Sequence, residues 1–151
     1  MPLTNVFAAA LLALLLTQPL QAEGPAQPVE ILTPDAPAYG EVLAALQPSV
    51  EELLGIPVGM NVRQLKVQGD FSFVSAEVIN PDGRAIDFSQ IRIADMAASN
   101  FDGPSLWAYL KRTDGAWQVL EQDIGPTDAW FAFWPSKHGG SCDIIHIGSE
   151  C

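Results

Sequence analysis

A predicted strand with apolar side chains on both faces constrains the fold more than any other feature of this chain. Two alternating segments, residues 105–112 and 116–123, flank Thr113-Asp114-Gly115 in a spacing that is typical of a tight β-hairpin. The two faces of the first segment alternate through Leu106, Trp107, Ala108, Tyr109 and Leu110. A strand that is apolar on both sides has to be covered on both sides. We therefore expect this segment near the centre of a sheet with a layer on each face.

An amphipathic helix is expected ahead of the sheet. Apolar residues recur at helical spacing over residues 39–54, and Gly55 is placed to end the helix. Asp35 is positioned to cap the first turn, with Pro37 inside that turn. Pro48 interrupts the apolar pattern, which predicts either a kink or a second helix that starts there.

Further strands follow the helix. Alternation over residues 58–67 changes phase near Arg63 and Gln64, which predicts a β-bulge. Residues 71–79 form the next expected strand. The fold class is therefore α+β, with an N-terminal kinked helix packed on a curved antiparallel sheet of four or more strands. This layout fits a cystatin-like or NTF2-like architecture, with a short C-terminal helix added.

Aromatic residues gather toward the C-terminus. Thr127 or Asp128 is placed to cap a short helix that Pro135 would end. The rings either pack this helix on the sheet, which we favour, or form a ligand-binding face. The candidate pocket residues are Trp107, Tyr109, Trp117, Asp128, Trp130 and Trp134.

The N-terminus indicates export. Residues 1–22 contain an apolar run followed by Pro19 and Ala22, which is typical of a cleaved signal peptide. We expect a flexible lead-in over residues 23–37, one domain over 38–135 and a tail over 136–151. The mature protein is then periplasmic or secreted, without a stable membrane anchor, because no second apolar span follows.

The mature domain is strongly acidic. The chain holds 18 acidic residues against seven lysines and arginines, a formal charge of −11, and the leader contains none of them. Such a domain repels nucleic acid and anionic membrane surfaces. A basic protein partner would suit it, although solubility alone also explains scattered acids.

Every histidine and cysteine lies in the last fourteen residues. Cys142 and Cys151 are expected to form a disulfide in an oxidising compartment. The alternative is a metal site made by His138, Cys142, His146 and Cys151, which together offer the ligand set of tetrahedral zinc. Their spacing is not that of a standard zinc finger, so we favour the disulfide and expect no cofactor.

Catalytic motifs are weak. Ser141, His138 and Asp128 can be drawn as a triad, but the G-x-S-x-G elbow is absent. No glycine-rich phosphate loop is present, and the scattered carboxylates have an ordinary surface interpretation. An enzyme would use a pocket between the sheet and the C-terminal helix, with Asp128 and His138 as acid and base.

One resemblance covers much of the domain. The motifs that carry it are Gly69-Asp70-Phe71-x-Phe73-Val74-x-Ala76, Leu110-Lys111-Arg112-x-x-Gly115-x-Trp117-x-Val119, and Ile124-Gly125-Pro126-Thr127-Asp128 with Trp130 and Trp134. The chain resembles a group of small exported bacterial proteins that share a GDW/F-A strand and a W-x-V…GPTD…W ending. The resemblance implies no activity, ligand or catalytic residue, and the His/Cys tail departs from the group.

These observations favour an exported, non-catalytic binding or interaction domain. Its expected ligand is a small hydrophobic molecule or a basic protein partner. The alternatives are a small enzyme and metal binding by the tail. The sequence does not specify the oligomeric state.

Overall fold

The computed structural model of the 151-residue chain describes residues 27–91 and 101–145. The strands are β1 (Glu30–Ile31), β2 (Gly59–Gln68), β3 (Phe71–Ile79), β4 (Ser105–Thr113) and β5 (Ala116–Ile124). The helices are α1 (Pro37–Leu54) and α3 (Trp134–His138), with the 3-10 turns η1 (Phe88–Gln90), η2 (Trp130–Phe133) and η3 (Cys142–Ile144). The predicted α+β class is confirmed.

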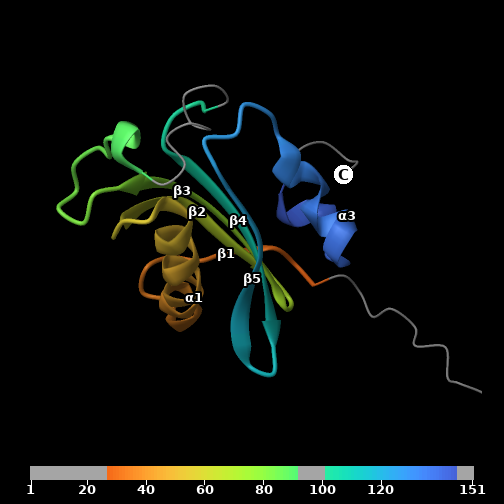
Figure 1. The fold of residues 1–151 in the computed structure, drawn as a ribbon. Helices are drawn as coiled ribbons and strands as arrows, with labels where there is room; N and C mark the ends of the chain where they lie inside the picture. The colour runs from red at the N-terminus through yellow and green to blue at the C-terminus, as the bar shows by residue number, and fades with distance from the viewer. Residues whose placement is uncertain (1–26, 92–100, 146–151) are drawn as a thin grey trace, which may run out of the picture.

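The strands form one antiparallel sheet in the order β1-β2-β3-β4-β5 (Figure 1). The hairpin that joins β4 to β5 turns at Asp114 and Gly115, with φ angles of 53° and 83°. Two successive positive φ angles match the twist of a tight hairpin. The β2–β3 register shifts between Val62 and Gln64, which confirms the bulge expected there.

Helix α1 covers one face of the sheet (Figure 1). Its buried residues recur every four positions at Val42, Leu46, Val50 and Leu54, so one stripe of the helix meets the strands. The main core of the protein lies between this stripe and the sheet. Gln122 in β5 also ties the two layers together, because its Nε2 donates to the Ser49 carbonyl at 3.0 Å.

The start of α1 differs from the prediction. Ala36 is the N-cap and makes no side-chain cap, while Asp35 accepts a 2.6 Å hydrogen bond from Thr33 Oγ1. A nearby hydroxyl therefore engages the carboxylate that was expected to cap the helix. The helix continues through Pro48, so the alternative of a second helix starting there is wrong. Gly55 ends the helix in the left-handed conformation, as predicted.

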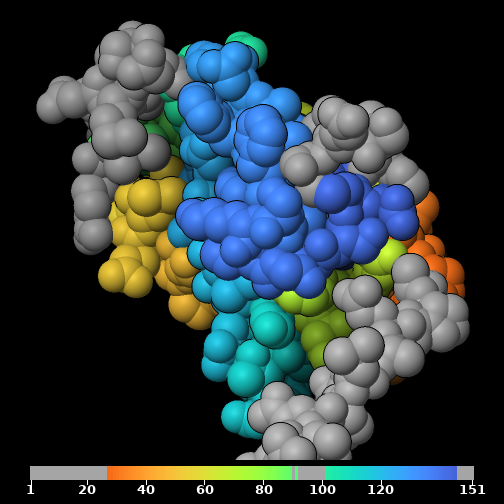
Figure 2. Space-filling model, turned by 90° about the vertical axis from the view of Figure 1, so that its right-hand side faces the viewer, coloured from red at the N-terminus to blue at the C-terminus, as the bar shows by residue number. Residues whose placement is uncertain are grey.

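The opposite face of the sheet is covered by residues 130–145, which we call the C-terminal segment (Figure 2). Phe131, Trp134, Ile144 and Ile145 of this segment are buried with Phe73 and Tyr109 of the sheet. Strand β4 thus has the α1 core on one side and this second core on the other. The prediction of a central strand covered on both faces is confirmed.

The C-terminal helix begins later than predicted. Residues 130–133 form the 3-10 turn η2, whose N-cap is Ala129 rather than Thr127 or Asp128. Pro135 lies in the first turn of α3, where its missing N–H costs no hydrogen bond, and does not end a helix.

Strand β1 lies within the segment that was expected to be a flexible lead-in. It pairs with β2 through Glu30–Val67 and Ile31–Lys66. Within the described residues, no helix is long and apolar enough to cross a membrane.

Candidate functional site

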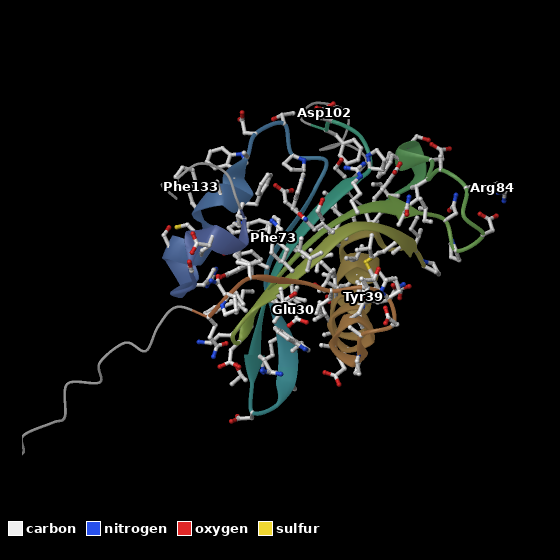
Figure 3. All side chains as sticks on the ribbon, turned by 180° about the vertical axis from the view of Figure 1, so that it is seen from behind. Glu30, Tyr39, Phe73, Arg84, Asp102 and Phe133 are labelled. Carbon is white, nitrogen blue, oxygen red and sulfur yellow. The ribbon has the colours of Figure 1, made fainter. Side chains whose placement is uncertain are left out.

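Aromatic rings line the face of the sheet under the C-terminal segment. Phe131 stacks on Trp107 with ring centroids 4.2 Å apart, and it also meets Phe73 at 5.8 Å. Trp134 meets Phe131 edge-on at 6.2 Å. Figure 3 shows Phe73 between the sheet and the C-terminal segment. These contacts support the interpretation that the C-terminal aromatic residues fold back onto the sheet.

Tyr109 is the most enclosed polar residue of this face. Its side chain is fully buried, its ring stacks on Phe71 at 5.5 Å, and its hydroxyl has no hydrogen-bond partner within the described residues. Burial raises the pKa of this hydroxyl, so it stays protonated. The hydroxyl lies against Gly140, where a Cβ atom would approach it closer than the 3.0 Å that real Cβ atoms respect. The absence of a side chain at Gly140 thus lets the chain after α3 cross over the tyrosine.

An ionic cluster joins the C-terminal segment to β5. His138 Nε2 lies 2.9 Å from Glu121 Oε1, and Lys137 Nζ forms an ion pair with the same oxygen. The Lys137 hydrogen bond, with a smaller effect from His138, lowers the pKa of the Glu121 carboxyl. Because Glu121 is opposite Tyr109 in the β4–β5 register, the carboxylate holds the imidazole above the tyrosine ring.

A groove runs beside this cluster, with a volume of about 440 Å³. It is lined by the β2–β3 turn (residues 68–71), by residues 138–141, and by Gln27 and Lys111. His138 therefore has one ring nitrogen on Glu121 while its side chain also lines the groove. The groove lies between the sheet and the end of α3.

Lys111 gives the groove its cationic group. Its Nζ lies over the Phe71 ring, 5.3 Å from the centroid, and it takes part in none of the ion pairs formed within residues 27–91 and 101–145. Asp70 also lines the groove, but Arg112 Nη2 contacts its carboxylate at 3.3 Å.

Gln68 adds a buried polar group to the groove wall. Its side chain is 8% exposed, and its Nε2 donates to the Gln27 carbonyl at 2.8 Å. The Oε1 atom accepts no hydrogen bond from any described residue. A buried acceptor without a donor costs free energy, which a ligand N–H or O–H could recover after a small movement of the wall.

Lys66 lies deeper under the same layer. It is 3% exposed, and within the described residues its Nζ donates one hydrogen bond, at 3.5 Å to the Ile145 carbonyl. Burial lowers the pKa of its amine. This lysine is a costly group for the fold and lies outside the groove lining.

The predicted pocket residues do not form one site in the structure. Trp107, Tyr109 and Trp134 lie together in the second core. Trp117 is in the main core on the α1 side of the sheet. Asp128 and Trp130 are exposed. The groove itself is formed largely by residues that the sequence did not single out.

The predicted disulfide and the predicted metal site both include residues outside the described structure. His146 and Cys151 lie outside it, so the disulfide and the four-ligand metal site stay predictions. No cluster of three or more metal-ligating side chains occurs in the part of the chain that is described. His138, expected to act with Asp128, has the carboxylate of Glu121 as its neighbour.

Comparisons of the chain with protein-family models, with curated proteins and with solved structures give no match. The site is therefore interpreted from its own geometry.

Proposed function

We propose that this protein is an exported, non-catalytic binding domain whose ligand occupies the groove between the β2–β3 turn and residues 138–141. The single observation that carries this proposal is Lys111. In a chain of charge −11, this lysine lines a groove of about 440 Å³ without a carboxylate partner in the described structure. A groove cation that no acidic side chain neutralises favours an anionic ligand group.

The groove also favours an apolar part in the ligand. The Phe71 ring forms part of its wall, next to the Lys111 ammonium. Gln68 adds the buried acceptor Oε1, which has no donor among the described residues and suits a ligand donor. The proposed ligand is therefore a small organic anion with an apolar or aromatic part, which narrows the small hydrophobic ligand expected from the sequence.

Three further parts of the proposal rest on the sequence. Residues 1–22 act as a cleaved leader, so that the domain works in the periplasm or outside the cell. The arrangement of helix α1 on a curved sheet is proposed to be cystatin-like or NTF2-like, with a kink at Pro48. The chain is proposed to belong to the group of small exported bacterial proteins that it resembles.

Binding can be tested with a matched set of small probes. 4-Phenylbutyrate, 4-phenylbutyramide and 4-phenylbutylamine share an apolar part and differ in charge. We expect the carboxylate to shift the backbone amide resonances of residues 68–71 and 138–141 and to bind at least fivefold more tightly than the other two. Lys111→Gln should remove that preference, because it removes the charge.

Arg84→Gln is the matched control, because it removes the same charge from an exposed residue outside the groove. It should leave the preference for the carboxylate unchanged. Equal binding of the three probes, or shifts spread over the whole surface, would overturn the proposed groove function.

A second candidate function is general-base catalysis, which the Glu121–His138 contact favours. A carboxylate that orients an imidazole at the edge of a groove is the arrangement used by general bases. The test compares the wild type with His138→Gln on a panel of esters and amides of 4-phenylbutyrate. Turnover that disappears in His138→Gln but persists in Ser136→Ala, an exposed neighbour, supports catalysis; no turnover in the wild type argues against it.

A further inference from the structure

Two large aromatic side chains stand exposed on η2, away from the groove. Trp130 and Phe133 are each 60% exposed. In a 3-10 helix the side chains at positions i and i+3 lie one above the other, so these rings share one side of η2. Figure 3 shows Phe133 at the outer edge of the C-terminal segment.

The two exposed rings are held in position by buried neighbours. Phe131 and Trp134, which alternate with them in sequence, are buried at 8% and 7% exposure in the second core. Burial of these neighbours fixes η2 on the sheet and holds the exposed rings in place. Tryptophan is among the side chains that carry most of the binding energy at protein–protein interfaces, and phenylalanine is also enriched there.

Exposed carboxylates gather at this end of the described structure. Asp128 precedes Trp130 by two residues and is exposed. Asp102, also exposed, is brought to the same end of the molecule because its N–H donates to the Gly125 carbonyl at 2.9 Å. No lysine or arginine occurs between Arg112 and Lys137, and Lys137 is paired with Glu121. Arg63, which reaches Ser105 Oγ at 3.3 Å beside Gly125, is already paired with Glu77 at 3.7 Å.

Asp123 continues this negative surface toward the sheet. It is half-buried opposite Trp107 in the register, next to the ring pair of Trp107 and Phe131. It forms no ion pair within the described part of the chain, and burial raises the pKa of its carboxyl. A cation brought to this place would be attracted by several carboxylates at once.

We propose that Trp130, Phe133 and Asp128 form a docking surface for an arginine-containing, cationic segment of a partner protein. A guanidinium can stack on the indole face and pair with a carboxylate in the same contact. A second copy of this chain fits poorly, because two chains of charge −11 repel each other, and an anionic lipid surface fits poorly for the same reason. This surface is independent of the groove.

The test uses a synthetic 12-residue peptide with four arginines and two leucines, together with its lysine and glutamate counterparts. Binding to the full mature chain is followed by calorimetry. We expect the arginine peptide to bind most tightly and the glutamate peptide not to bind. Trp130→Ala should weaken binding of the arginine peptide at least tenfold, and Asp128→Asn about threefold to fivefold.

Two matched controls separate this surface from general attraction. Ile31→Ala truncates an equally exposed apolar side chain, at 61%, on another part of the molecule. Asp114→Asn removes one charge at the exposed β4–β5 turn. Both should change binding less than twofold. Equal losses in the controls and in Trp130→Ala and Asp128→Asn would overturn the proposal, because the attraction would then be unspecific. It would also fail if sedimentation showed a dimer that Trp130→Ala dissociates.

Discussion

The contact between Gly140 and Tyr109 gives the sharpest prediction about how the C-terminal segment is held. In Gly140→Ala the new Cβ atom would overlap the Tyr109 hydroxyl and lie 3.2 Å from Cζ of the same ring. The ring is fully buried and stacked on Phe71, so it has little room to move away. We expect the segment to be pushed from the sheet.

The expected loss of folding stability in Gly140→Ala follows from the contacts of the new Cβ atom with the Tyr109 hydroxyl and with Cζ of the ring. Overpacking of this kind costs about 1–3 kcal/mol, and we expect a value near the upper end because the hydroxyl overlap is severe. Tyr109→Phe alone should be neutral or stabilising by about 1 kcal/mol, because it removes a buried hydroxyl without a partner in the described structure. Once Tyr109→Phe has removed the hydroxyl, the new Cβ atom keeps a 3.2 Å contact with Cζ of residue 109 and a 3.4 Å contact with Phe71 Cγ, and a shift of a few tenths of an ångström relieves the shorter one.

Urea unfolding of the two single variants and the double variant measures this coupling. We expect Gly140→Ala to cost about 1–2 kcal/mol less in the Tyr109→Phe background than in the wild type. Gly139→Ala serves as the control, because its φ of +83° strains the backbone while nothing lies within 4 Å of its Cβ. Its cost should be equal in both backgrounds. If the cost of Gly140→Ala is also equal in both, the hydroxyl does not control the packing of this segment.

Three further predictions concern ionisable and sulfur groups. Lys66→Met should raise the free energy of unfolding at pH 7 by about 1 kcal/mol, since it replaces a buried charge. Because burial lowers the folded-state pKa of Lys66, this gain should be largest at low pH and vanish above pH 10.5, as denaturation curves at several pH values will show. The pKa of Glu121 is lowered in the folded state, so its charged form stabilises the fold. Glu121→Gln should therefore lower the free energy of unfolding by about 1 kcal/mol above pH 4.5 and change it little in more acidic solution, measured by the same denaturation curves. If the leader is cleaved after Ala22, the intact mass of the exported protein should correspond to a chain that starts at Glu23. If Cys142 and Cys151 are paired, this mass should be two hydrogens short, and reduction should lower the free energy of unfolding by about 2–3 kcal/mol in urea titrations; unchanged stability on reduction would contradict the disulfide.

Local turn chemistry made much of the sheet predictable. The Asp114–Gly115 turn defined the β4–β5 hairpin, and the alternation on both faces of β4 predicted the two layers that enclose it. The phase change near Arg63 was sufficient to predict the bulge in β2. Each of these features depends on a few neighbouring residues, so a single sequence carries the signal.

The residues of the candidate site are brought together by the register of β4 against β5. The aromatic residues in the sequence do not indicate that register. Trp117 is opposite Arg112, so the turn itself places it on the α1 face, away from Trp107. A second irregularity, between Tyr109 and Leu110, places Glu121 opposite Tyr109. Without that irregularity Leu120 would occupy this position. The sequence offered no sign of the irregularity, and the Glu121–His138 contact was therefore missed.

The position of the C-terminal segment also has a consequence for the order of folding. A chain that emerges from its N-terminus can form α1 and all five strands before residues 130–145 are available. Until then, Phe73, Trp107 and Tyr109 face the solvent as an apolar patch on a nearly finished sheet. Such a late-closing face is open to aggregation and to chaperone binding. Residues 130–145 therefore complete the second core and decide whether an almost folded molecule reaches a soluble state.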